Sequence, residues 1–343
     1  MKSYINQPVF ICGHRKTGTT MLLCLLDSHP QLLVYPADSA FFYALYPRSE
    51  EEQWPLKKKL DRLADYSIAN LKKEVNDLAS ADRKKLSFSI SQFTKDFKAQ
   101  AGRSGAAPKE LLKSLISAFA KNSGQNIGPV ERWVEKTTST EIYATEIIKW
   151  FPRAKFIQLV RDPRDNWAAL KAAWEGRYRK FNDSSLTLLQ SLLERGKLGM
   201  ELAILNQKII GRKQYLIVRF EDLVSQPKKY LTEICKFLNI KYQADLLKPT
   251  VLGKWWPGNS FENLKFKGPS KAKVGQWPKR ITKEEAHLVE YYFYDLMKHF
   301  NYRPKSTLKQ RVAAAVKHYK WHNFAQVYSF ADAKITKYTK KDS

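Results

Sequence analysis

The sequence predicts an α/β protein in which helices cover both faces of a central parallel sheet. Three short apolar runs, each followed by residues with helical spacing, predict strands at 8–12, 155–160 and 215–220. Strands that are apolar along their whole length are typical of parallel sheets, because both faces of such a sheet are buried. A chain of 343 residues is long enough for one large core with additional helices.

The first predicted strand leads into a glycine-bounded loop at residues 13–20, which reads GHRKTGTT. The loop keeps the glycine spacing of a nucleotide-binding P-loop, but Thr19 stands where the P-loop lysine would be. An ordinary strand-to-helix turn is the alternative. Backbone N–H groups, hydroxyls and a helix N-terminus suit phosphate, whereas the missing lysine favours a phosphoanhydride other than that of ATP. We predict a P-loop-type three-layer fold whose phosphate-binding residues are Arg15, Lys16, Thr17, Gly18, Thr19 and Thr20.

Helices are predicted after the other two strands, where apolar residues recur at helical spacing over 167–174 and 231–238. The stretch from about 48 to 130 is charged and helix-prone without a clear strand, which predicts a helical insertion. We expect one domain over 1–304 and a basic, helical C-terminal extension, a pair of helices, over 305–343.

The chain is strongly basic, with a formal net charge of +27. This surplus favours anionic ligands, nucleic acid or an anionic surface without choosing among them. Cys12, Cys24 and Cys235 lie in apolar runs without metal-ligand spacing, which indicates buried thiols in a reducing compartment and no metal site. The first strand begins too early for a signal peptide, and no apolar run reaches the roughly 20 residues of a membrane span, so we expect a cytoplasmic protein.

Four further segments accompany the loop. Glu135-Lys136-Thr137 precedes the second predicted strand, and LVRDPRD at 159–165 closes it. The third strand is followed by FEDL at 220–223, and VGQW lies at 274–277. Together with the loop, these segments resemble the sulfotransferases that use 3′-phosphoadenosine 5′-phosphosulfate, in particular the group of bacterial, carbohydrate and tyrosylprotein enzymes. The resemblance covers about 8–45 and 131–300, and leaves the predicted insertion and the C-terminal extension unmatched.

The resemblance implies a set of residues for the cofactor. The loop would bind the 5′-phosphosulfate and Arg161 the 3′-phosphate, while Lys273, Val274 and Gly275 would belong to a segment that closes over the cofactor. The family usually has a serine eight residues after the arginine, and this chain has Ala169 there. Either Asn166 or Lys171 would replace that contact, or Lys267 and Lys273 would take more of the phosphate.

The chemistry of sulfuryl transfer implies roles for four residues. Negative charge builds on the bridging oxygen during in-line transfer, so a nearby cation lowers the barrier, and Lys16 is the candidate; a metal ion need not be invoked. The acceptor hydroxyl must lose a proton. Asp38 occupies the place of a family glutamate before a Phe-Phe pair, although it could instead cap the following helix. Glu135 and Lys136, which match a Glu-Lys pair of the family, compete for these catalytic roles. The alternative is that they form a solvated ion pair at the end of a strand.

The acceptor is expected to be a hydroxyl on a glycan, and an anionic glycan would match the basic residues. A nucleic acid partner is not expected. Lys and Arg are frequent over 254–283, where Glu262 is the single acid. Aromatic residues interleave with these cations, as suits sugar rings that bear anionic groups. They are Trp255, Trp256, Phe261, Phe266 and Trp277. The unmatched insertion should build the acceptor site.

Two other functions are compatible with parts of the sequence. A P-loop kinase acting on ATP would need the missing lysine. A catalytically inactive P-loop scaffold that binds anionic polymers or membranes would explain the charge, but retention of Lys16 and Arg161 argues against it. In either an active or an inactive protein, the basic C-terminus could make peripheral contact with an anionic membrane.

Overall fold

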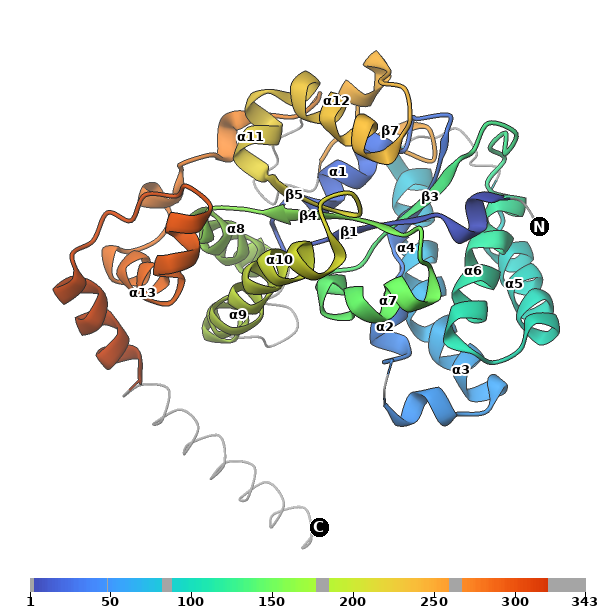
Figure 1. Ribbon diagram of the computed structural model, residues 1–343, viewed down its shortest axis with the longest axis horizontal. Helices are drawn as coiled ribbons and strands as arrows, with labels where there is room; N and C mark the ends of the chain where they lie inside the picture. The colour runs from blue at the N-terminus through green and yellow to red at the C-terminus, as the bar shows by residue number, and fades with distance from the viewer. Residues whose placement is uncertain (1–2, 48, 82–87, 177–184, 259–266, 320–343) are drawn as a thin grey trace, which may run out of the picture.

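The computed structural model describes residues 3–47, 49–81, 88–176, 185–258 and 267–319 (Figure 1). At its centre lies a five-stranded parallel sheet with strand order β2-β3-β1-β4-β5. The strands are β1 (Pro8–Cys12), β2 (Leu32–Asp38), β3 (Arg132–Lys136), β4 (Lys155–Val160) and β5 (Tyr215–Arg219). The predicted α/β class with a P-loop-type central parallel sheet is confirmed.

Two of the five strands were not predicted. β2 contains Pro36 and lies at the edge of the sheet, where a missing N–H can face away from the neighbouring strand. β3 carries three charged residues, although all five of its side chains are buried. Glu135 and Lys136 therefore do not merely precede a strand, as expected, but form the end of one.

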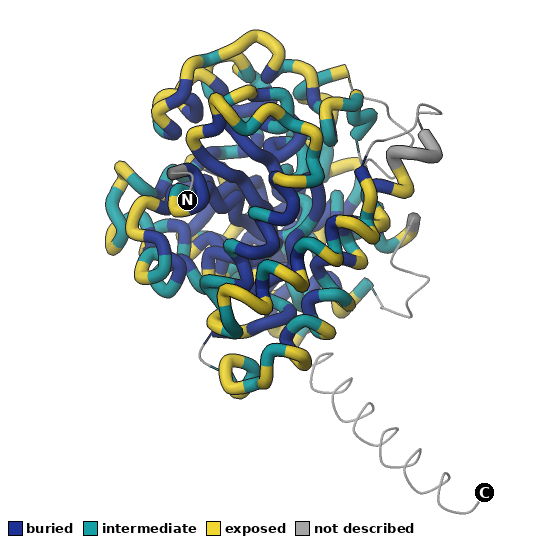
Figure 2. Tube along the Cα trace, turned by 90° about the vertical axis from the view of Figure 1, so that its right-hand side faces the viewer, coloured by how far each residue is buried: buried dark blue, intermediate teal, exposed yellow. Residues whose placement is uncertain are grey.

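The sheet is covered on both faces because successive side chains point to opposite sides. Phe10 and Phe156 face one core cluster, whereas Ile11 and Ile157 face another. Helices α1 (Thr19–Leu26) and α12 (Pro227–Leu238) cover the second face, and α6 (Pro108–Asn122), α7 (Ala144–Trp150) and α10 (Lys197–Ile210) cover the first (Figure 1). Figure 2 shows buried residues concentrated along the strands in this central layer.

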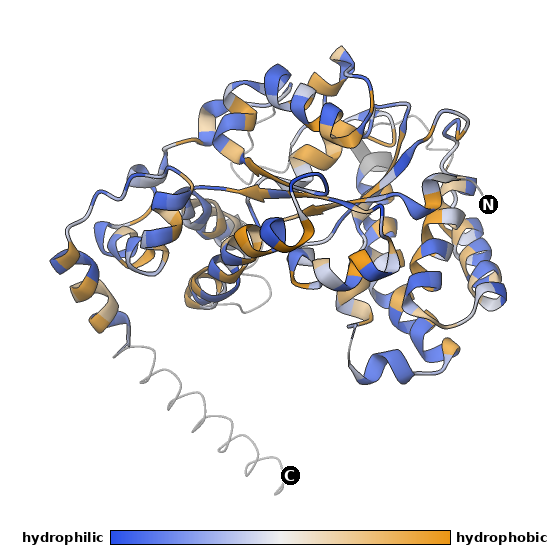
Figure 3. Ribbon diagram, in the orientation of Figure 1, coloured by the Kyte–Doolittle hydropathy of each residue, from blue (hydrophilic) through white to orange (hydrophobic). Residues whose placement is uncertain are grey.

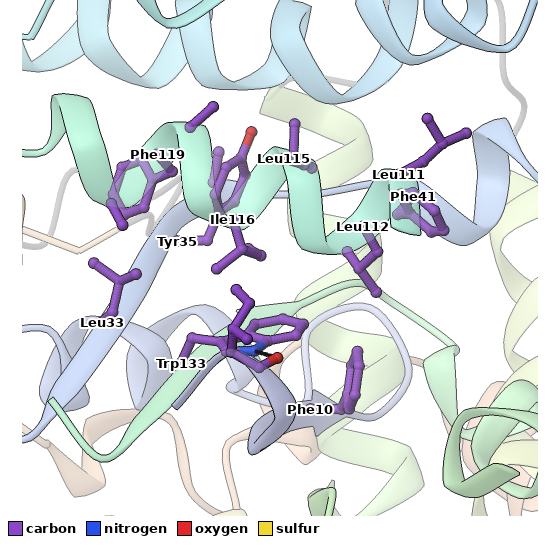
Figure 4. Packing of buried hydrophobic residues seen from close by; sticks show 14 of the residues in the cluster. Phe10, Leu33, Tyr35, Phe41, Leu111, Leu112, Leu115, Ile116, Phe119 and Trp133 are labelled. Atoms are coloured by element: carbon purple, nitrogen blue, oxygen red, sulfur yellow. Dashed lines mark hydrogen bonds between the residues drawn. The ribbon is translucent and has the colours of Figure 1, made fainter. Parts of the chain in front are cut away.

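The described residues between 50 and 122 are largely helical and share their core with the sheet. They form a 3₁₀ turn (Glu50–Gln53), α3 (Leu56–Leu63), a π-helical turn (Ala64–Ile68), α4 (Ala69–Ala81), α5 (Ile90–Ser104) and α6. In Figure 4, Leu112, Leu115 and Ile116 of α6 approach Tyr35 and Trp133 of the sheet. The division of the chain into a domain with an insertion and an extension stays a prediction.

Helix α2 (Phe41–Ala44) follows β2 and lies beside α3. The remaining helices lie on the side of β4 and β5 (Figure 1). They are α8 (Pro163–Gly176), α9 (Ser185–Ser191) with a π-helical turn (Leu192–Gly196), α11 (Phe220–Ser225) and α13 (Lys283–His299). Residues 308–319 are also helical. The second helix expected in the extension, with Trp321, lies outside the described residues. No helix in the described ranges is both long and apolar enough to cross a membrane.

Candidate active site

The predicted site residues lie at one edge of the sheet, because all five strands are parallel and their carboxyl ends meet there. The loop at 13–18 follows β1, the central strand. Arg161 follows β4 on one side of β1, and Asp38 and Lys136 end β2 and β3 on the other side. The loop therefore lies between Arg161 on one side of β1 and the candidate catalytic residues Asp38 and Lys136 on the other side.

Two glycines give the loop its shape. At Gly13, with φ 134°, an added Cβ would lie 2.7 Å from the carbonyl oxygen of Leu159. At Gly18, with φ 100°, it would lie 2.6 Å from the ring of Phe220. Both the left-handed backbone and the close neighbours exclude larger residues. Lys16 also has a positive φ of 67°, a strained conformation that brings it to the wall of a cavity.

His14 and Asn166 hold this loop from the inside. The His14 Nδ1 lies 3.3 Å from the Asn166 Oδ1, and the Asn166 amide donates to the carbonyl oxygen of Arg15 at 2.7 Å. Burial, assisted by the nearby cations Arg15 and Arg195, lowers the pKa of His14 to about 4. His14 is therefore neutral at physiological pH and supports the loop from within the core.

A cavity of about 180 Å³ lies beside the loop. Among the described residues, four cations and one acid line it, namely Lys16, Arg161, Lys273 and Arg280, and Asp165. The apolar part of the wall consists of small and aromatic side chains, and a flat ring could lie between them. These apolar residues include Ala168, Ala169, Ala172, Phe220, Pro249 and Trp256. Four cations against one carboxylate suit a ligand that carries several negative charges.

Arg161 joins the loop to the segment at 270–280. Its Nη1 donates to the carbonyl oxygen of Lys16 at 2.8 Å, and its Nη2 donates to that of Lys273 at 3.1 Å. The guanidinium lies 4.4 Å from the centre of the Phe220 ring. Its buried Nε has no hydrogen-bond partner among the described residues, so Arg161 retains donor capacity at the cavity.

Asp165 holds the same segment in place and was not singled out by the sequence. One of its carboxylate oxygens accepts from the backbone N–H of Gly275 at 2.5 Å, and the other accepts from that of Trp277 at 2.9 Å. The Asp165 side chain is buried, and both oxygens are occupied by backbone donors. The predicted closing segment with Lys273, Val274 and Gly275 is therefore fixed by a carboxylate from α8.

Ala169, which stands in place of the family serine, lines the cavity. Of the four residues expected to replace the serine's contact, only Lys273 also lines the cavity among the described residues. Asn166 bonds to the loop, and the Lys171 ammonium lies 3.0 Å from the Glu285 carboxylate, so neither lines the cavity. Lys267 is exposed and is also not part of the wall, whereas Lys273 is. Arg280 is a further cation at this wall that the sequence analysis did not select.

Asp38 and Lys136 form an ion pair on the other side of the loop. The Lys136 Nζ lies 3.0 Å from one Asp38 oxygen, and the second oxygen is buried without a hydrogen-bond partner in the described structure. The Asp38 side chain is 33% exposed. The alternative role of Asp38 as a helix cap is wrong, since α2 has Ala40 at its N-cap and no side-chain cap bond.

Glu135 lies on the face of β3 opposite to Lys136 and is fully buried. Its Oε2 accepts hydrogen bonds from the Ser39 hydroxyl at 2.5 Å and from the Thr137 hydroxyl at 3.0 Å. Burial raises the pKa of Glu135 to about 7. Because no part of this side chain reaches solvent, the arrangement favours Asp38 over Glu135 as the group that meets an acceptor.

The fold and the cation-lined cavity define an α/β protein with a P-loop-like site for a phosphate-bearing ligand. A model described as "Sulfotransferase family" matches residues 8–244, which is more than half of the chain. The chain therefore belongs to the sulfotransferase family, as its resemblance predicted. The matched range includes the helical stretch that had no counterpart in the predicted resemblance, and it ends before the segment at 270–280.

Two similar proteins are animal enzymes. Protein-tyrosine sulfotransferase of Drosophila melanogaster is 23% identical over 240 residues, which are 70% of this chain and 39% of that protein. Protein-tyrosine sulfotransferase A of Caenorhabditis elegans is 21% identical over 239 residues, covering 70% of this chain and 51% of that protein. The chain thus matches about half or less of the length of these relatives.

Two solved structures share the fold. The sulfotransferase domain of the Synechococcus PCC 7002 olefin synthase has a TM-score of 0.56 and 20% identity, covering 87% of this chain and 95% of that one. The sulfotransferase domain of the curacin biosynthetic pathway has a TM-score of 0.56 and 17% identity, with 87% and 99% coverage. Both support the three-layer arrangement described above.

We expect Glu135→Gln to make the protein less sensitive to pH. Because the folded-state pKa is raised, Glu135 stabilises the fold below about 4.5, and this contribution is lost as the pH rises through about 7. The variant, which cannot ionise, should be more stable than the wild type at pH 8 by up to about 3 kcal/mol and similar to it at pH 4. Denaturant titrations across this range measure the difference.

Glu146→Gln serves as the control, since Glu146 is paired with Lys149 on the surface at 3.3 Å. It should follow the wild-type pH dependence. Curves for Glu135→Gln and wild type that run parallel from pH 5 to pH 8 would contradict a buried, proton-binding Glu135.

We expect Asp165→Asn to weaken the binding of adenosine 3′,5′-bisphosphate about tenfold, because one of the two backbone donors loses its carboxylate partner. The KM for the donor should rise, while the KM for the acceptor stays unchanged. Isothermal titration and steady-state kinetics measure these effects. Asp222→Asn, which affects a partly exposed pair with Arg219, should behave as wild type. Equal losses in both variants would count against the assigned role of Asp165.

Proposed function

We propose that this chain transfers a sulfuryl group from 3′-phosphoadenosine 5′-phosphosulfate to an acceptor hydroxyl. The observation that carries the proposal is the cavity in which Lys16, Arg161, Lys273 and Arg280 meet beside a P-loop without its usual lysine. Membership of the sulfotransferase family supports it. The donor supplies two phosphate groups and the sulfuryl group, and the four cations provide matching charge.

The cations have different positions and therefore different proposed roles. Lys16 lies in the loop directly before α1, where backbone N–H groups and the helix N-terminus can already bind the 5′-phosphate. Its ammonium would act on the charge that develops on the bridging oxygen. Arg161 would bind the 3′-phosphate, since its fork of donors suits phosphate oxygens.

Asp38 is the proposed general base. It is partly exposed, and one of its oxygens is held by Lys136. The second oxygen is buried and has no hydrogen-bond partner within the described residues, so the carboxylate keeps an unused acceptor position. Lys136 would orient the carboxylate, and it would also offset negative charge that gathers at the acceptor.

The acceptor class predicted from the sequence loses part of its basis. The glycan was suggested by the basic and aromatic stretch at 254–283. Three residues of that stretch line the cavity together with the loop, namely Trp256, Lys273 and Arg280. The part of that stretch at 259–266 lies outside the described residues. We therefore assign the described residues of this stretch to the donor, and propose the acceptor from the surroundings of Asp38.

Those surroundings combine aromatic rings with a guanidinium group. The Tyr43 hydroxyl donates to the carbonyl oxygen of Thr138 at 2.6 Å. Burial first, and then the Asp38 carboxylate, raises the pKa of Tyr43 to about 12, while Arg195 acts in the opposite direction. Burial also raises the pKa of Tyr143, and Arg195 acts against that rise as well. Such a site suits a ring-bearing hydroxyl near an anionic group, which describes both a sugar and a tyrosyl peptide.

The similar animal enzymes are named for protein tyrosine, and this makes a tyrosyl peptide a candidate acceptor beside a glycan.

The cytoplasmic compartment also remains part of the proposal. Cys12, Cys24 and Cys235 are buried free thiols, which supports a reducing environment.

We expect adenosine 3′,5′-bisphosphate to raise the melting temperature more than ATP with Mg²⁺ does, because the cavity supplies cations for a 3′-phosphate and lacks the P-loop lysine. At about 100 times the dissociation constant, the bound ligand adds roughly 2.7 kcal/mol to stability. Thermal-shift titrations with both ligands test this. Equal shifts, or a shift with ATP alone, would favour a kinase.

We expect Asp38→Asn to lower turnover by about 10²–10⁴ with almost unchanged donor affinity, since the amide cannot take the acceptor proton. The measurement is transfer of labelled sulfate to tyrosyl peptides and to saccharides, alongside donor titration. The control is Asp96→Asn, which removes a carboxylate of α5 that pairs with Lys121 of α6 at 2.7 Å. This variant should retain full turnover. Normal turnover of Asp38→Asn would exclude Asp38 as the base.

A further inference from the structure

The helix at residues 308–319 presents an apolar stripe to solvent. Four of its apolar residues recur at intervals of three or four positions and are exposed. They are Leu308 (67% exposed), Val312 (41%), Val316 (51%) and Tyr319 (65%). Residues at this spacing share one face of a helix. In Figure 3 this helix carries hydrophobic positions at the outer edge of the molecule, beyond α13.

A different face of the same helix anchors it to the protein. Ala314 and Ala315 are buried in the cluster built by α8, α10 and α13. The Arg311 guanidinium lies 4.1 Å from the centre of the Tyr294 ring and donates to the carbonyl oxygen of Ser306 at 2.7 Å. Lys317 pairs with Glu284 of α13 at 2.7 Å. The helix is thus fixed in place while its apolar stripe points elsewhere.

The sequence around the stripe is basic. From residue 303 to residue 331 it contains no Asp or Glu and six Lys or Arg. One of these, Lys317, is paired with Glu284. Lys309, within the helix, is exposed. In the sequence, Tyr319 is followed by Lys320 and Trp321. A solvent-facing apolar stripe that includes a tyrosine, within a basic stretch of sequence, has the composition of helices that lie in a membrane interface.

The same charges argue against a second copy of this chain as the partner. A twofold interface would bring identical surfaces together, so that the cations of one copy would face those of the other. An anionic bilayer instead supplies both acyl chains for the stripe and phosphates for the cations.

We propose that residues 308–319 bind the surface of an anionic lipid bilayer, with Leu308, Val312, Val316 and Tyr319 inserted at the headgroup boundary. The interaction does not depend on the proposed transferase activity, because no residue of the stripe lines the cavity.

The test is sedimentation of the full-length protein with phosphatidylcholine vesicles that contain about 30% phosphatidylserine. We expect binding to these vesicles, at least tenfold weaker binding to pure phosphatidylcholine, and a decline as salt is raised from about 50 to 500 mM. Leu308→Glu with Val316→Glu should lower binding at least tenfold. The matched control is Leu205→Glu with Ile209→Glu on α10, whose side chains are 48% and 59% exposed, and it should bind as wild type.

Circular dichroism and melting curves establish that each variant is folded; if the double variant is not, Leu308→Ser alone replaces it. Equal binding by the stripe variant and the control variant, or equal binding to both vesicle types, overturns the proposal. Loss of a dimer in the stripe variant, measured by analytical ultracentrifugation, would instead identify a second copy as the occupant. Failure of the wild type to bind either vesicle type would also reject the membrane.

Discussion

The buried guanidinium of Arg161 is the interaction on which the site depends. It bonds to the backbone of the phosphate-binding loop and to the backbone of the segment at 270–280, which are far apart in the sequence. Burial lowers the pKa of Arg161, whereas Asp165, Glu221 and Asp162 favour its charged form. An arginine remains protonated in such a place, so the cost of burial must be met by partners. Two carbonyl oxygens, three carboxylates and the Phe220 ring offset part of that cost. The two carbonyl contacts hold the loop and the segment at 270–280 together at the wall of the cavity.

The parallel sheet explains why one loop can serve two kinds of chemistry. Strand order reverses around β1, so that its loop lies between the ends of β3 and β4. The cations of the cavity lie on the side of β4, where we propose that the donor binds, and the Asp38–Lys136 pair lies on the side of β3. In-line transfer needs a donor and an acceptor on opposite sides of the transferred group. The topology supplies that separation before any side chain is considered.

Much of the fold could be predicted from the sequence, because β1, β4 and β5 are continuous apolar runs and the glycines mark the loop. β2 and β3 were not predicted, because Pro36 in β2 and the charged residues at the ends of β3 do not fit the pattern of a continuous apolar strand. The burial of these residues depends on partners distant in the chain, such as Ser39 for Glu135. Asp165 lay within a predicted motif, yet its function depends on the N–H groups of Gly275 and Trp277. Composition could locate the aromatic and basic stretch at 254–283, but only the fold brings its Trp256 and Lys273 to the donor side of the loop.

The first residues of the predicted extension belong to the same network as Arg161. Glu290 accepts from the backbone N–H groups of Lys305 and Ser306, and it pairs with Arg164 at 2.6 Å. Arg164 in turn pairs with Asp162, directly beside Arg161. Arg311 bonds back to Ser306, so the helix at 308–319 is connected to the cavity through contacts of fixed geometry. A surface that held this helix would therefore also set the orientation of the cavity relative to that surface.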